Sequence, residues 1–163
     1  MQEVLTRYYQ SATDMSLQLL TKMAKAIGEN EDYFSEAFEK PMSLLRGNYY
    51  PARPATAGDK DHGIAAHTDY GCLTLLAADG TPGLEVLALD GATWIPVHTE
   101  PGEFVINFGD MMQFWTNGRV KATLHRVVGT NAERISVPFF FNPNYYTNVA
   151  PPSSGVEIIA GEH

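Results

Sequence analysis

The sequence has little cysteine and no long apolar run. Its 163 residues include one cysteine, Cys72, and a single cysteine cannot form an internal disulfide, which excludes a small secreted fold held by disulfides. No apolar stretch approaches the roughly 20 residues that cross a bilayer. The first residues also lack the basic stretch and apolar run of a signal peptide. We therefore expect a cytoplasmic protein with no membrane partner.

Positive charge is also scarce. Lys and Arg number 11 against 19 Asp and Glu, which gives a formal net charge of -8. Nucleic-acid binding that is independent of base sequence needs a basic surface, so we expect no nucleic-acid partner. The charged fraction is 18% and the hydrophobic fraction is 44%. This composition favours one folded domain over a disordered chain.

The first part of the chain has helical periodicity. Apolar side chains recur at helical spacing between residues 3 and 27, and Gly28 is suited to the position after a helix end. A second, shorter helix is expected over residues 31–38, ending before Pro41. We expect residues 1–41 to form a helical segment that packs on the rest of the molecule.

The remainder of the chain has the residue pattern of a β protein. Short runs of β-branched and aromatic residues alternate with Gly, Pro and Asp turns. These runs predict strands at residues 44–50, 64–68, 73–77, 84–87, 93–96, 104–108, 112–115, 122–128 and 135–142. Many short strands at this spacing predict a sandwich or barrel. A mainly β fold of the double-stranded β-helix type (a cupin-like jelly-roll barrel) over residues 42–150 fits best, with residues 151–163 as a C-terminal tail.

Two residues with metal-binding side chains stand two positions apart in this β-rich segment. His67 and Asp69 would point to the same face of a strand, so an imidazole nitrogen and a carboxylate oxygen could converge on one ion. His125, in the predicted strand 122–128, is the best candidate for a third ligand. Two His and one carboxylate leave one side of the metal open, which suits Fe(II) that must bind a cosubstrate and O₂ together. The simpler alternative is a His hydrogen-bonded to a neighbouring Asp.

The other histidines and the cysteine lack such a context. His62 and His98 have no carboxylate partner at strand spacing, so we expect them to be surface or structural residues, and His163 lies at the terminus. We expect Cys72 to be a small packing residue and not a nucleophile.

Downstream of His125, an arginine and a serine share one face of a predicted strand. Arg134 and Ser136 are separated by one residue, and an arginine inside a barrel is costly unless it meets an anion. A guanidinium beside a hydroxyl is suited to binding a carboxylate through two hydrogen bonds. Glu133 is adjacent in sequence and would point to the opposite face, so it is a poor internal partner.

Several motifs, in this order, resemble the 2-oxoglutarate/Fe(II) oxygenases related to isopenicillin N synthase. They are GIAAHTDYGCLTLL at residues 63–76, PGEFVINFGD at 101–110, WTNGR at 115–119, LHRV at 124–127 and RISVPFFFNP at 134–143. The resemblance covers roughly residues 42 to 150. Several motifs in the family's order make a chance resemblance very unlikely.

The resemblance implies a role for each matched residue. His67, Asp69 and His125 match the iron ligands of the family. Arg134 and Ser136 match the pair that binds the distal carboxylate of the cosubstrate 2-oxoglutarate. Asn48 and Tyr50 match positions that contact the same cosubstrate in many relatives; alternatively, they only end a strand before a proline. Asn107, Gly109 and Asp110 match a turn that we expect to be structural.

The implied activity is that of a dioxygenase. Such an enzyme uses Fe(II), 2-oxoglutarate and O₂ to oxidise a C–H bond of a small organic substrate, by hydroxylation, desaturation or cyclisation, and releases succinate and CO₂. No catalytic residue beyond the metal site is expected. Tyr70, Cys72, Tyr145 and Tyr146 are expected near the mouth of the barrel. Members of the family are usually about twice as long, with an added N-terminal region and a C-terminal helix, so we expect a more open pocket here.

Three alternatives stay open on the sequence. An oxidase of the same fold can carry the Arg-x-Ser pair for an anion other than 2-oxoglutarate. A truncated, non-catalytic barrel could bind a carboxylate ligand without turnover. A zinc-dependent hydrolase would need a general base near the metal and would leave the Arg-x-Ser pair without a role.

Overall fold

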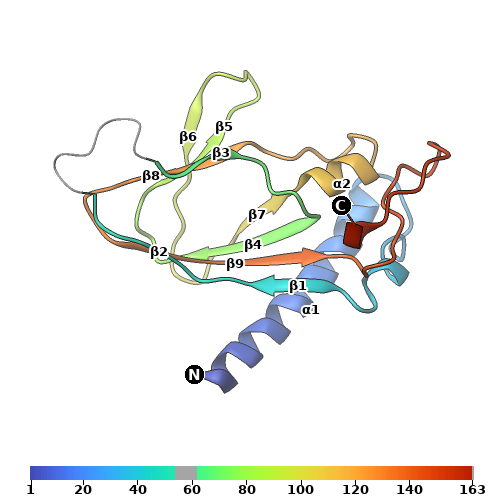
Figure 1. The fold of residues 1–163 in the computed structure, drawn as a ribbon, viewed down its shortest axis with the longest axis horizontal. Coiled ribbons are helices and arrows are strands. Elements are labelled where there is room, and N and C mark those ends of the chain that lie inside the picture. The colour runs from blue at the N-terminus through green and yellow to red at the C-terminus, as the bar shows by residue number, and fades with distance from the viewer. Residues whose placement is uncertain (54–61, 163) are drawn as a thin grey trace.

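The computed structural model describes residues 1–53 and 62–162, with no description of the side chain of residue 62, and its core is built from two antiparallel sheets (Figure 1). The strands are β1 (Met42–Leu45), β2 (Asn48–Tyr50), β3 (His62–His67), β4 (Leu73–Ala78), β5 (Leu84–Leu87), β6 (Trp94–Pro96), β7 (Val105–Phe108), β8 (His125–Val128) and β9 (Arg134–Asn142). The larger sheet has the order β1-β9-β4-β7, with β2 also paired to β9, and the smaller sheet has the order β3-β8-β5-β6. The expected mainly β fold with a preceding helix is therefore confirmed.

The helices are α1 (Gln2–Ala26), α2 (Asp110–Trp115) and the short 3₁₀ turns Glu36–Phe38 and Ala160–Glu162. Helix α1 lies against the larger sheet, which it crosses near β1 and β9 (Figure 1). None of the helices in the described part of the chain combines the length and apolar character needed to cross a membrane.

The two faces of strand β9 serve different purposes. Phe139 and Phe141 are fully buried in the core cluster that includes Leu20 and Ala24 of α1. Residues whose side chains point to the opposite face, such as Ser136 and Phe140, line a cavity between the sheets. Because successive side chains of a strand point to opposite faces, one strand provides both the apolar core and the floor of the cavity.

Three predicted elements differ in the structure. Residues 112–115, predicted as a strand, lie in helix α2 because Met111, Met112 and Trp115 are buried at helical spacing; so short an apolar run does not distinguish a strand from a helix. The predicted helix 31–38 consists of turns with one 3₁₀ turn, and the predicted strand 44–50 divides into β1 and β2.

The last described residues return to the body of the molecule. Asn148 and Ile159 form an antiparallel bridge, and the backbone N–H of Ala160 donates to the carbonyl of Thr147 at 2.9 Å. Ala160 is buried in the main core cluster. These contacts hold residues 158–162 beside the strands instead of leaving them free.

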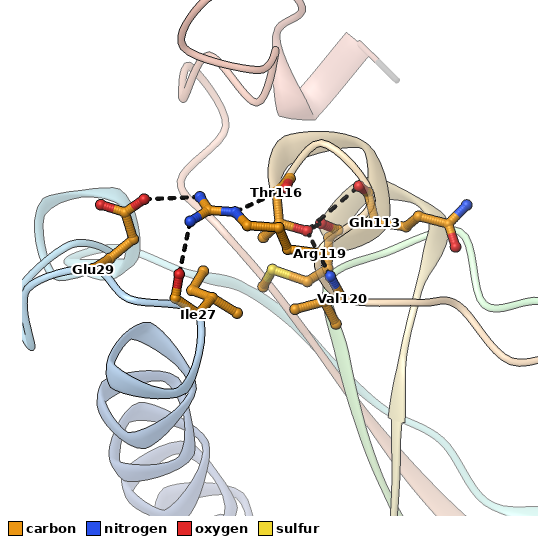
Figure 2. Close-up of polar contacts among 7 residues, drawn as sticks. Ile27, Glu29, Gln113, Thr116, Arg119 and Val120 are labelled. Atoms are coloured by element: carbon orange, nitrogen blue, oxygen red, sulfur yellow. Dashed lines mark hydrogen bonds and ion pairs between the residues drawn. The ribbon is translucent and has the colours of Figure 1, made fainter.

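Arg119 ties the C-terminal end of α1 to the segment that follows α2. Figure 2 shows its guanidinium between the two, where Nη1 donates to the carbonyl of Ile27 at 2.8 Å and Nε to that of Thr116 at 3.2 Å. Its Nη2 forms an ion pair with Glu29 at 2.8 Å. The hydroxyl of the buried Thr116 donates to the carbonyl of Met112 and accepts the N–H of Val120. One side chain thus satisfies carbonyls at two helix ends.

We expect Arg119→Gln to lower the free energy of unfolding by about 1–2 kcal/mol. This value is at the low end for a charged hydrogen-bonding group, because the Arg119 side chain is partly exposed. Thermal melting followed by circular dichroism would measure the change. Arg7→Gln, which removes the same charge from an exposed position of α1, is the matched control and should melt like the original chain. Identical melting of the two variants would contradict a bridging role for Arg119.

Candidate metal centre and anion site

The smaller sheet brings the three predicted metal-ligand residues together. His67 ends β3 and is paired in register with His125, the first residue of β8, while Asp69 follows β3 after one intervening residue. One potential ligand atom from each of the three lies within 4.8 Å of the others. His125 is buried, and the side chain of Asp69 is only 10% exposed.

Backbone carbonyls fix which nitrogen of each imidazole faces the gap between these residues. Nδ1 of His67 lies 2.8 Å from the carbonyl oxygen of Ala65, and Nδ1 of His125 lies 3.0 Å from that of Thr123. A carbonyl only accepts hydrogen bonds, so each Nδ1 carries the proton and each Nε2 keeps its lone pair for a ligand. Hydrogen bonds of this kind orient the histidines that bind metals in proteins.

Asp69 lacks the partner that a buried carboxylate needs. Its Oδ2 is buried with no hydrogen-bond partner in the described part of the chain, and its Oδ1 lies 3.7 Å from Nε2 of His125. That distance is too long for a hydrogen bond, so a simple His–Asp pair does not account for the arrangement. A buried carboxylate without partners is costly. Two imidazole nitrogens and one carboxylate oxygen form a donor set that could hold a divalent metal such as iron.

The start of helix α2 holds the loop that carries Asp69. Backbone N–H groups of α2 and its preceding residue donate to carbonyls of this loop: Asp110 to Asp69 (2.7 Å), Met111 to Tyr70 (3.1 Å) and Gly109 to Cys72 (3.1 Å). A side chain at position 109 would collide with the carbonyl oxygen of Gly71. The turn at Gly109–Asp110, expected from the family resemblance to be structural, therefore sets the position of the Asp69 carboxylate.

Asn142 holds the other side of the same loop. Its buried Oδ1 accepts the backbone N–H of Cys72 at 3.0 Å, and Gly71 lies so close that a β-carbon there would collide with the amide. Sequence reasoning assigned no role to Asn142. Its place at the end of the motif RISVPFFFNP was the available signal, but only the pairing of β9 with β4 brings it to the loop.

The predicted anion site forms where β2 pairs with β9. Tyr50 lies opposite Arg134 and Asn48 opposite Ser136 in the antiparallel register. The Asn48 amide donates to the Ser136 hydroxyl at 3.5 Å, and the guanidinium carbon of Arg134 lies 5.1 Å from the centre of the Tyr50 ring. The four residues therefore form one group, although Asn48 and Ser136 are 88 positions apart in the sequence.

Arg134 lacks the partner that its burial requires. Only 3% of the residue is exposed, and its Nε and Nη1 are buried without a hydrogen-bond partner. No ion pair joins it to an Asp or Glu within the described ranges. A buried guanidinium in this state is costly unless an anion meets it.

One narrow cavity of about 90 Å³ joins the predicted metal-ligand residues to the predicted anion site. Its lining includes all seven predicted residues: Asn48, Tyr50, His67, Asp69, His125, Arg134 and Ser136. Three further polar residues line it: Arg46 and Thr74, which the sequence analysis did not single out, and Asn107, which it expected only in a structural turn. Arg46 could have been predicted from its spacing, because it stands two positions before Asn48 and on the same side of the segment.

Other residues singled out in the sequence lie elsewhere. Cys72 is fully buried as a packing residue, and burial raises the pKa of its thiol. Tyr70, Tyr145 and Tyr146 are exposed and, like Cys72, do not line this cavity. His98 is exposed. The side chain of His62 and the whole of His163 lie outside the described residues.

The described geometry has parallels in known proteins. A 2-oxoglutarate-Fe(II) type oxidoreductase of Emericella nidulans, hxnY, is 35% identical over 153 residues, covering 91% of this chain and 44% of that protein. Gibberellin 20 oxidase 2 of Oryza sativa subsp. indica is 38% identical over 155 residues, covering 94% of this chain and 39% of the relative. The chain thus spans less than half the length of these curated relatives.

Solved structures match both the sheets and the helix. JOX2 in complex with 2OG, Fe and JA superposes with a TM-score of 0.85 at 34% identity, covering 95% of this chain and 46% of that one. A full-length Neurospora crassa protein in complex with alpha-KG gives a TM-score of 0.90 at 25% identity, covering 99% and 55%. Residues 41–143, well over half of the chain, match the family model of the 2OG-Fe(II) oxygenase superfamily. This chain therefore belongs to the 2OG-Fe(II) oxygenase superfamily.

Proposed function

We propose that this chain is the iron- and 2-oxoglutarate-binding part of a dioxygenase that oxidises a C–H bond of a small organic molecule. His67, Asp69 and His125 would hold Fe(II), and Arg134 with Ser136 would bind the distal carboxylate of 2-oxoglutarate. One observation carries the proposal: a single cavity contains a buried carboxylate oxygen without a partner and a buried guanidinium without a partner. A cation at one end and an anion at the other would satisfy both.

Bound Fe(II) would supply the redox chemistry that couples conversion of 2-oxoglutarate and O₂ into succinate and CO₂ to oxidation of the substrate. The residues of the chain would bind and orient the cosubstrate and the substrate, and they would exclude water from the site. The Nδ1 hydrogen bonds of His67 and His125 would keep their Nε2 atoms available to the metal. Leu76, Leu84 and Val127 form an apolar cluster that lines the same cavity and would limit its water content.

The hydrolase alternative has little support in this cavity. A zinc hydrolase needs a general base beside its metal, and Asp69 is the only carboxylate among the described residues that line the cavity. The substrate class proposed here, a small organic molecule, follows relatives whose structures contain JA or thymine. The cytoplasmic location expected from the lone Cys72 stays a prediction.

We expect His67→Ala, Asp69→Ala and His125→Ala each to abolish stoichiometric iron binding, because loss of one of three protein ligands destroys the site. Iron content would be measured after anaerobic loading with Fe(II) and desalting. His98→Ala removes an exposed histidine outside the cavity and should bind iron as the original chain does. Full iron content in the His125→Ala variant would disprove the ligand assignment.

Replacement of Arg134 should weaken 2-oxoglutarate binding without loss of iron. Arg134→Lys keeps the charge and loses the planar fork, which predicts a roughly ten- to hundredfold loss of affinity. Arg134→Ala should cost more, because one end of the dicarboxylate would be buried unpaired, and Ser136→Ala should cost less. Anaerobic calorimetric titration of the iron-loaded proteins measures the affinities. Equal affinities in all variants would remove 2-oxoglutarate from the mechanism and favour the oxidase or the non-catalytic barrel.

A further inference from the structure

A second, larger cavity of about 560 Å³ adjoins the first beside strand β2. The two cavities share six lining residues: Arg46, Asn48, Tyr50, Ile64, Val127 and Arg134. The larger one extends from these residues to Arg53 and to the segment after β8, including Thr130. Its size is that of an ordinary small-molecule site. Arg134 therefore lines both the cavity of the predicted metal ligands and the larger cavity.

Positive charge is concentrated in the larger cavity. Three of the six arginines in the sequence, Arg46, Arg53 and Arg134, line it. The described lining residues include no Asp or Glu, although the chain has a net charge of -8. Cations gathered in a concave site raise the local concentration of anions.

Arg53 makes the strongest case for a ligand. Its backbone N–H donates to the carbonyl of Thr130 at 2.7 Å, which anchors the residue at the cavity wall. Its Nε and Nη2 are buried and have no hydrogen-bond partner among the described residues. By contrast, Arg119 and Arg126 form ion pairs with Glu29 and Glu85. Buried guanidinium nitrogens without partners are costly and indicate a missing acceptor.

Two acidic residues in the described part of the chain, Glu133 and Asp79, lie near this cavity and contact other groups. Glu133 raises the pKa of the Tyr49 hydroxyl beside it. Asp79 accepts the backbone N–H of Ile135 at 2.6 Å and that of Thr81 at 2.9 Å. Neither residue lines the cavity, although Asp79 lies near enough to Arg134 for the two charges to attract each other.

We propose that the larger cavity is a second anion-binding site, in which Arg53 and Arg46 bind a carboxylate of a small dicarboxylate on the outer side of Arg134. The choice of a dicarboxylate rests on the proposed function, which brings one to Arg134. The carboxylate has two sources: a 2-oxoglutarate molecule on its way to the metal cavity, or a second dicarboxylate bound at the same time. Both would use the same paired guanidinium–carboxylate contacts.

The test measures binding in the larger cavity, in the full chain without added metal. Arg134→Gln removes the arginine that the two cavities share, and succinate, titrated by calorimetry, measures the binding that Arg53 and Arg46 still provide. We expect this variant to retain succinate binding. Adding Arg53→Gln should weaken that binding roughly ten- to hundredfold, the usual effect of losing charge-assisted hydrogen bonds, and Arg46→Gln should weaken it less because that side chain is exposed.

Two variants keep the result interpretable. Arg7→Gln removes the same charge from an exposed position of α1, outside the cavity lining, and should not alter succinate binding. Arg53→Lys keeps the charge and loses the planar fork, so its affinity for succinate should lie between those of the original chain and of Arg53→Gln, which a merely structural role of the guanidinium would not predict. Melting by circular dichroism checks that each variant folds. Equal succinate affinities in the Arg53→Gln and Arg7→Gln variants, with Arg134 present or replaced, would overturn the proposal.

A second titration separates the two sources. Succinate is added to the original chain after anaerobic saturation with Fe(II) and 2-oxoglutarate. Arg53-dependent binding that persists identifies a separate dicarboxylate site. Loss of that binding shows that 2-oxoglutarate itself occupies this site on its way to the metal cavity. If the original chain failed to bind 2-oxoglutarate in the presence of iron, the proposed function would be rejected. The effect of Arg53→Gln on succinate binding, measured without metal, would still be valid.

Discussion

The pairing of strand β9 with its neighbours is the constraint on which the rest of the structure depends. It joins β1 and β2 on one edge to β4 on the other, and its alternating side chains divide apolar core from polar cavity. Phe139 and Phe141 face the core with α1, whereas Arg134 and Ser136 reach the cavity. A shift of one residue in this register would exchange the two faces, so the fold and the site depend on the same pairing.

The metal-ligand residues depend on a second set of contacts, between elements distant in sequence. Asp69 lies on a loop held on one side by the start of α2 and on the other by Asn142. Helix α2 is in turn tied to the end of α1 through Arg119 (Figure 2). If Asp69 binds a metal together with two imidazoles, as proposed, it needs such support, because a small displacement would separate the three ligand atoms.

Much of the site could be predicted because its residues obey strand periodicity. The pairs at positions 67 and 69 and at 134 and 136 each share one face, and the order of the motifs indicated His125. The structure brings all of them to one cavity. Helix α2 was mispredicted because Met112–Trp115 is too short for its period to decide. Arg53 had no local signal and Asn142 only its place at the end of a motif, since the surroundings of both arise from strand pairing and loop contacts.

The central claim is that this chain, with less than half the length of its curated relatives, holds iron and 2-oxoglutarate in one cavity. Anaerobic titration of the iron-loaded chain with 2-oxoglutarate, followed by the weak visible charge-transfer band of the chelate, tests it most directly. The band should appear and saturate at one 2-oxoglutarate per iron. A folded chain that binds iron and develops no band at saturating 2-oxoglutarate would contradict the account.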